Sequence, residues 1–214
     1  MDKDMIGILF QEWASIFSEN VDYLTELDAV AGDADLGLVM NDGFEAVFRV
    51  VSEMDENDIG RIFHTAGKEF NKAASSSMGT LLSFGLMNIG KEYQGKTEIS
   101  DEDIVNILQL IANGVKRVGK ANEGEKTFLD GIYPAIKAIE EHKGEGIITQ
   151  LEMGLKGAKD GVDKAKMMKA VHGRIAFKGD DSIGITDPGS VVAMFMVQGL
   201  YDAVSKYYAI SKEQ

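Results

Sequence analysis

Apolar residues recur every three or four positions along most of the chain, a spacing that predicts amphipathic helices. The first stretch runs to about Ser18, with Met5, Leu9 and Trp13 on one face and Asp4 as its expected N-cap. No segment shows the alternating pattern of a half-buried strand. We therefore expect an all-α fold, a bundle of about eight antiparallel helices. The other helical stretches lie near residues 20–27, 40–51, 58–70, 81–89, 101–119, 127–142, 146–169 and 191–208.

Four polar loops that contain glycine interrupt this pattern, near residues 31–37, 73–80, 119–127 and 173–189. Antiparallel helices joined in succession place alternate loops at the same end of a bundle. We therefore expect the four loops to meet at one end. The last of them is the longest stretch without clean periodicity, and a long irregular loop inside a compact domain is usually functional or disordered.

Composition narrows the class of protein. The 214 residues, 44% apolar and 27% charged, are typical of a globular chain, and we expect one domain over residues 1–214. The net charge of −13 argues against binding to nucleic acid, which needs a basic face. The absence of cysteine excludes a thiolate metal site. No signal peptide and no membrane-spanning run is recognisable, so we expect a cytoplasmic protein that binds no membrane.

Three aspartates, Asp28, Asp33 and Asp35, fall within eight residues of one short loop. If they converge, each pair about 4 Å apart costs on the order of 4 kcal/mol at an effective dielectric of 20. Such a cluster needs a cation, and carboxylate oxygens suit Mg²⁺ or Ca²⁺. An acidic turn exposed to water fits the spacing equally well. An EF-hand does not fit, because Phe44 stands where that loop needs a bidentate glutamate.

The acidic loop leads directly into a helix, whose first backbone amides favour anions such as phosphate. The loop Ser75–Thr80 offers hydroxyls for a phosphate, although a plain capping turn for a helix beginning near Thr80 explains it as well. The loop Gly119–Thr127 is not a P-loop, because Glu125 separates the glycine from the lysine and a helix precedes it.

Three motifs, in this order and spacing, resemble the L subunit of dihydroxyacetone kinase: LDxxxGDxDxG at 27–37, GKAxxGEKTxxD at 119–130 and GRxxxxGxxSIGxxDPG at 173–189. The resemblance covers nearly the whole chain. It implies a closed barrel of amphipathic helices that binds ADP or ATP through two Mg²⁺ ions in a depression at the loop end. It also implies phosphoryl transfer to a short ketose on a separate K subunit, with ATP or a phosphotransferase-system protein as donor. A homodimer is compatible with it.

The resemblance implies a role for individual residues. Asp28, Asp33 and Asp35 would hold the magnesium ions, and no residue need act as a nucleophile. The residues that would contact the nucleotide are Leu36, Gly37, Leu38, Ser76, Ser77, Met78, Gly119, Phe128, Arg174, Asp187, Pro188 and Gly189.

The chain departs from the family pattern in three of its loops. Leu36 stands where many relatives have histidine, and Ser75–Gly79 replaces Gly-Gly-Ala-Ser-Gly. Asp180-Asp181 and Ile185 stand where Glu-Arg and a histidine are common. These departures suggest a divergent L subunit; the alternative is a regulatory or nucleotide-binding subunit with weakened catalysis.

Overall fold

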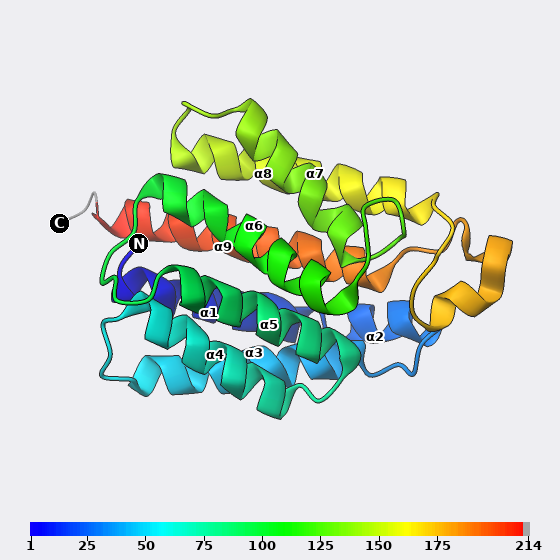
Figure 1. Ribbon diagram of the computed structural model, residues 1–214, viewed down its shortest axis with the longest axis horizontal. Coiled ribbons are helices and arrows are strands. Elements are labelled where there is room, and N and C mark those ends of the chain that lie inside the picture. Colours follow the sequence, from blue (N-terminus) through cyan, green and yellow to red (C-terminus); the bar gives the residue numbers. More distant parts are fainter. Residues whose placement is uncertain (212–214) are drawn as a thin grey trace.

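The computed structural model describes residues 1–211, and over these the chain is helical throughout, as the apolar spacing predicts. Eight of the α-helices run along the long axis of the molecule (Figure 1). The helices are α1 (Lys3–Glu19), α2 (Val21–Ala29), α3 (Leu36–Glu53), α4 (Ile59–Ala73), α5 (Ser77–Glu92), α6 (Asp101–Gly119), α7 (Phe128–Glu141), α8 (Ile147–Lys166), the 3₁₀ helix η1 (Arg174–Ser182) and α9 (Pro188–Ser211).

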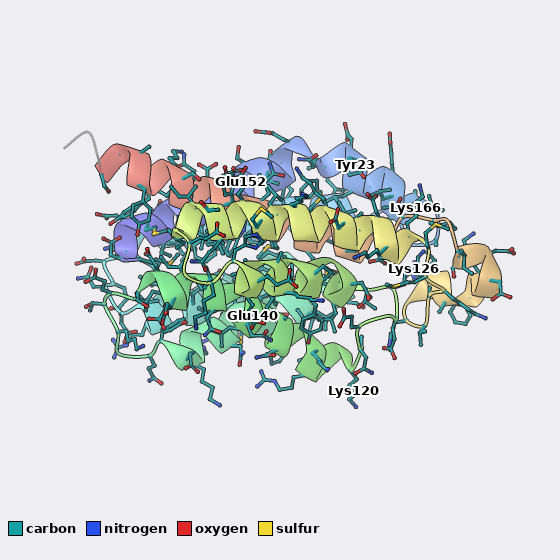
Figure 2. The ribbon with its side chains drawn as sticks, turned by 90° about the horizontal axis from the view of Figure 1, so that it is seen from above. Tyr23, Lys120, Lys126, Glu140, Glu152 and Lys166 are labelled. Carbon is teal, nitrogen blue, oxygen red and sulfur yellow. The ribbon has the colours of Figure 1, made fainter. Side chains whose placement is uncertain are left out.

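The eight long helices close a ring. In this ring α1 packs on α3, each helix from α3 to α8 packs on the next, and α9 packs on both α8 and α1. The short α2 and η1 lie together at one end of the bundle, opposite the N-terminus (Figure 1). Seen from above, the labelled Lys126 and Lys166 lie toward this same end (Figure 2). The expected barrel of antiparallel helices with its loops at one end is therefore confirmed.

The core explains why the ring closes where it does. Trp13 on α1 is fully buried, and its indole N–H donates a hydrogen bond of 2.9 Å to the carbonyl of Met196 on α9. A Cβ at Gly199 would lie 2.3 Å from the indole ring, so only glycine lets α9 approach this closely. Trp13 thus joins the first and last helices of the ring, the core role that its place in the apolar stripe predicts.

Two predicted helix starts are wrong by two or three residues. Asp2, not Asp4, caps α1, because its carboxylate accepts the amide of Met5 at 3.0 Å. The helix expected near Thr80 begins at Ser77 and is capped by Ser76. Both errors arise because neighbouring polar residues offer alternative caps, and the packing of the helix decides between them.

The segment 173–189 is less irregular than its sequence suggests, since Arg174–Ser182 forms η1. Among the described residues, no helix is long and apolar enough to cross a membrane.

Candidate functional site

A cavity of about 830 Å³ lies where the four loops meet. Asp28, Asp33 and Asp35 line one side of it, and Arg174 lies on the segment that covers another side. Of the eleven other residues predicted to contact the nucleotide, nine line the cavity and two do not. Lining are Leu36, Ser76, Ser77, Met78, Gly119, Phe128, Asp187, Pro188 and Gly189; Gly37 and Leu38 do not line it.

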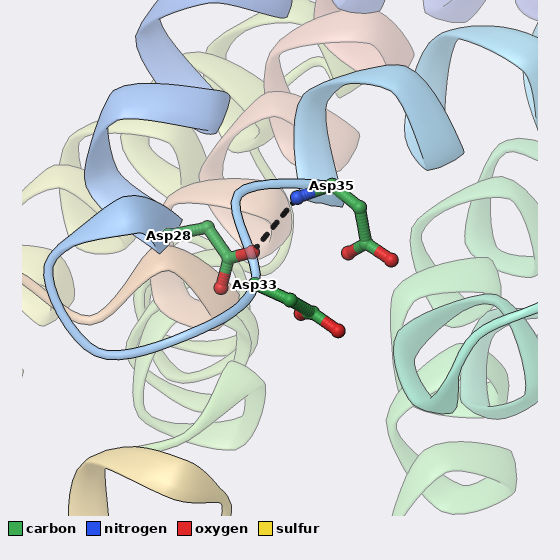
Figure 3. A group of neighbouring side chains, drawn as sticks. All are labelled: Asp28, Asp33 and Asp35. Carbon is green, nitrogen blue, oxygen red and sulfur yellow. Dashed lines mark hydrogen bonds between the residues drawn. The ribbon is translucent and has the colours of Figure 1, made fainter.

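The three aspartates converge as expected. One carboxylate oxygen from each lies within 4.8 Å of the others (Figure 3). The backbone amide of Asp35 donates to a carboxylate oxygen of Asp28 at 3.2 Å, which folds the loop back on the end of α2. Ala34 between the other two aspartates has φ 61, a left-handed conformation that non-glycine residues adopt at a cost of roughly 1–2 kcal/mol.

The electrostatics of the cluster fit a divalent cation. Partial burial raises the pKa of Asp35, and the charges of Asp33 and Asp28 raise it further, while Arg174 opposes them. Arg174 lies 2.8 Å from a carboxylate oxygen of Asp33 and so neutralises part of the cluster. An all-carboxylate donor set that is short of positive charge is the chemistry that Mg²⁺ and Ca²⁺ prefer.

The N-terminus of α3 adds backbone donors to this cluster. Asp35 is the N-cap, yet no side chain accepts a hydrogen bond from the first amides of the helix. Gly37 is needed for packing, since a Cβ there would lie 2.0 Å from the carbonyl of Val21 on α2. Leu38 is 54% exposed and does not line the cavity.

Leu36 contributes both to the hydrophobic core and to the cavity wall. Its side chain belongs to the hydrophobic core, with 7% exposure, and also lines the cavity. Leu36, which replaces a histidine of the family pattern, is therefore an apolar part of the cavity wall.

The serine loop before α5 forms the capping turn that its sequence allows, and it also lines the cavity. Ser76 caps the helix, because its hydroxyl accepts the amide of Gly79 at 3.0 Å. Ser75 and Ser77 line the cavity as well. The turn is tight, since a Cβ at Gly79 would lie 1.8 Å from the carbonyl of Ala74.

The opposite wall comes from the start of α7 and the start of α9. Thr127 and Asp130 form a capping box at α7, and the Asp130 carboxylate also accepts the amide of Gly124. The Asp187 side chain accepts the amide of Ser190 at 2.6 Å and so starts α9. Burial raises the pKa of Asp187 to about 7.

Several lining residues were not predicted from the sequence. An apolar wall comes from α5, α6 and α7, and a hydrogen bond joins the loops, in which His172 lies 2.6 Å from Glu125. Helical periodicity marked Leu81 and Val115 as apolar helix positions but gave no sign that they face a cavity. The apolar wall residues are Leu81, Val115, Val118 and Leu129.

The fold and the site together define a class: an all-helical ring that presents clustered carboxylates and uncapped helix amides to one cavity, suited to a divalent cation and an anionic ligand. The sequence model of the family described as "DAK2 domain" matches residues 30–202. The chain belongs to this family.

Two curated relatives support the resemblance to L subunits. The chain is 31% identical over 187 residues to the ADP-binding subunit of the PEP-dependent dihydroxyacetone kinase of Escherichia coli, covering 86% of this chain and 89% of the relative. It is 28% identical to the ADP-binding subunit of PEP-dependent dihydroxyacetone kinase 1 of Listeria innocua, covering 88% and 90%.

Solved structures show the same fold. The dihydroxyacetone kinase of C. freundii in its native form matches with a TM-score of 0.72 at 19% identity, over 95% of this chain and 35% of that one. The same enzyme in complex with AMP-PNP and Mg²⁺ matches with a TM-score of 0.71 at 18% identity, over 94% and 34%. The chain therefore spans about a third of that longer kinase.

Proposed function

We propose that this protein is the nucleotide-binding subunit of a dihydroxyacetone-type kinase, which binds ADP or ATP with two Mg²⁺ ions and transfers a phosphoryl group to a short ketose held by a separate K subunit. The observation that carries the proposal is the convergence of Asp28, Asp33 and Asp35 at the cavity that the four loops enclose. Family membership and the ADP-binding relatives support it.

The charges in the cavity suit a nucleotide. Two Mg²⁺ ions carry more positive charge than the three carboxylates carry negative charge, so a cavity in an acidic chain attracts a phosphate tail when the ions are bound. Bound Mg²⁺ would neutralise charge on the phosphates. The protein would contribute the carboxylates that hold the ions, the amide of Leu36 at the start of α3, and Arg174, whose guanidinium can pair with two phosphate oxygens.

The remaining walls suit the base and ribose. Phe128 is 2% exposed, and it joins Gly119 and the apolar wall of the cavity. Apolar surface with few polar groups is the usual lining for a flat aromatic ligand. Phosphoryl transfer needs mainly charge neutralisation and alignment, so no protein nucleophile is required.

The K subunit is a proposed partner, since the ketose must meet the phosphate at the open side of the cavity. Phe177 on η1 is 94% exposed and follows the cavity-lining residues Arg174 and Ile175, and Met167 and Val171 in the segment before η1 are both more than half exposed. Exposed aromatic side chains are typical anchors of protein interfaces. This apolar rim is where we expect the K subunit to dock.

The principal experiment measures ADP binding by calorimetry with and without Mg²⁺. We expect Asp33→Asn to abolish measurable Mg²⁺-dependent binding. The matched control is Asp42→Asn, an exposed α3 residue outside the cavity, which should bind like the unchanged protein. Unaltered affinity in the Asp33 variant would overturn the proposal.

Two further observations decide the details. ADP that stays bound through dialysis favours a phosphotransferase-system phosphoprotein as donor, and an empty site favours exchange with ATP. The alternative of a regulatory subunit rests on Leu36 and Ile185, which replace family histidines and line the cavity. Measurable turnover with a K subunit and a short ketose would exclude that alternative.

A further inference from the structure

Lys126 is a buried lysine that contacts no carboxylate at ion-pair distance within residues 1–211. Its side chain is 1% exposed, and its Nζ donates to three main-chain carbonyls. The acceptors are Lys166 at 3.0 Å, Met168 at 3.2 Å and Ser182 at 2.9 Å. All three protons of the ammonium group thus have partners, which is what permits a charged group to be buried there.

The three acceptors lie at the two ends of one segment. Lys166 is the last residue of α8, and Ser182 is the last residue of η1. We call residues 167–182 the Arg174 arm, because the arm carries this arginine to the cavity. Two other bonds join its ends: the amide of Ala170 donates to the Ser182 hydroxyl at 2.9 Å, and the amide of Gly184 donates to the Lys166 carbonyl at 2.8 Å.

The arm is also held between its ends. Lys169 pairs with Asp180 at 2.8 Å within the arm, and His172 lies 2.6 Å from Glu125, the neighbour of Lys126.

The backbone around Arg174 itself is less constrained. Gly173 and Gly179 have φ values of 69° and 58°, so the backbone on both sides of Arg174 adopts conformations that glycine allows. Arg174 is 62% exposed, and its ion pair with Asp33 joins the arm to the loop that carries the three aspartates. The position of the guanidinium therefore depends in part on how the ends of the arm are fixed.

We propose that Lys126 is a positioning residue: its ammonium group clamps the two ends of the Arg174 arm and thereby sets Arg174 at the phosphate side of the cavity. This rests on the proposed function, in which Arg174 contacts the nucleotide. The clamp is electrostatically favourable at Lys166, because a cation near the last carbonyls of α8 complements the helix dipole. Lys126 and Lys166 lie at the same end of the bundle as η1 (Figure 2).

The test is a double-mutant cycle that combines Lys126→Met with Arg174→Gln. Methionine fills similar volume without the charge. We expect Lys126→Met to weaken Mg²⁺-dependent ADP binding roughly three- to tenfold in the unchanged background and less than twofold when Arg174 is already replaced. Lys120→Met is the control, since Lys120 also has a positive φ and precedes the same turn but is exposed and outside the cavity.

Hydrogen exchange tests the clamp without any ligand. The amides of residues 167–182 should exchange faster in Lys126→Met than in the unchanged protein, while those of α4 stay the same. Unchanged exchange in the arm overturns the clamp, whether or not the protein binds nucleotide. Equal losses of affinity in both backgrounds overturn the link to Arg174, because a residue that only supports the fold acts independently of it.

If Lys126→Met does not fold, a second variant tests the same junction. Ser182→Ala removes the hydroxyl that accepts the Ala170 amide and donates to the Gly179 carbonyl at 2.6 Å, and so loosens the same junction from the other side. We expect it to increase exchange in the arm and to show the same dependence on Arg174. Additive effects of Ser182→Ala and Arg174→Gln would contradict the proposal.

Discussion

The guanidinium of Arg174 lies 2.8 Å from the carboxylate of Asp33, so the segment before α9 reaches across the cavity to the loop before α3. The two residues are more than 100 positions apart in the sequence, and their side chains are 62% and 49% exposed. At this exposure the pair itself stabilises the fold by at most about 1 kcal/mol. Its importance is that Arg174 pairs with the same carboxylate that a metal ion would use.

Replacing Arg174 by glutamine should therefore change the affinities for two ligands in opposite directions. Mg²⁺ alone should bind as tightly or a few-fold more tightly, because it no longer competes with the guanidinium for Asp33. ADP with Mg²⁺ should bind roughly ten- to a hundredfold more weakly, because a charge-assisted hydrogen bond to phosphate contributes roughly 1.5–3 kcal/mol. Calorimetry with each ligand measures both. Arg49→Gln, an exposed α3 change outside the cavity, is the control, and a loss of affinity for both ligands would contradict this account.

Gly37 should tolerate no side chain. A Cβ would lie 2.0 Å from the Val21 carbonyl and 2.4 Å from the Thr25 hydroxyl, so Gly37→Ala must push α2 away from α3. We expect a loss of about 1–3 kcal/mol in the free energy of unfolding, as for other overpacked positions. Gly7→Ala is the control: nothing lies within 4 Å of its Cβ, and it should stabilise α1 by roughly 0.5–1 kcal/mol. Urea unfolding gives both values, and equal effects would refute the steric argument.

The sequence predicted those features that depend on local spacing. Helical periodicity identified the ring, and the close spacing of Asp28, Asp33 and Asp35 identified the cluster, because eight residues cannot separate three carboxylates far. Ser100 and Thr127 cap α6 and α7 with capping boxes, which are local patterns of the same kind.

The features that were missed depend on contacts distant in sequence. Leu81 and Val115 each belong to a helix with many apolar residues, so the sequence does not single them out. Only the packing of α5 on α6 turns them toward the cavity. Lys126 donates to carbonyls 40 and 56 residues away, which no side-chain pattern encodes. Leu36 stands where many relatives have histidine; its burial explains why an apolar side chain suits that position.

Phe177 should matter for turnover and not for nucleotide binding. It is 94% exposed and does not line the cavity, so Phe177→Ser should leave Mg²⁺-dependent ADP affinity unchanged. If the K subunit docks on this rim, loss of a central aromatic anchor costs about 2 kcal/mol of binding, or roughly thirtyfold in the KM for the K subunit. Steady-state kinetics with varied K subunit measures this. Phe84→Ser, a partly exposed aromatic outside the rim, is the comparison, and an equal effect there would argue against docking at η1.

The last prediction concerns Asp187, whose burial raises the pKa of its carboxyl from 3.8 to about 7. Between these values the folded protein keeps a proton that the unfolded chain has lost, so the free energy of unfolding falls as pH rises through this window. Asparagine cannot ionise, and its side-chain oxygen can still accept the Ser190 amide that starts α9.

Asp187→Asn should therefore become more stable relative to the unchanged protein as pH rises from about 4 to 7, with the difference levelling off above that range. Urea unfolding of both proteins at several pH values measures the difference, and subtraction removes every other titrating group that the two share. A difference that stays constant with pH would mean that the Asp187 carboxyl titrates alike in the folded and unfolded chains, and burial at the start of α9 would then carry no electrostatic cost.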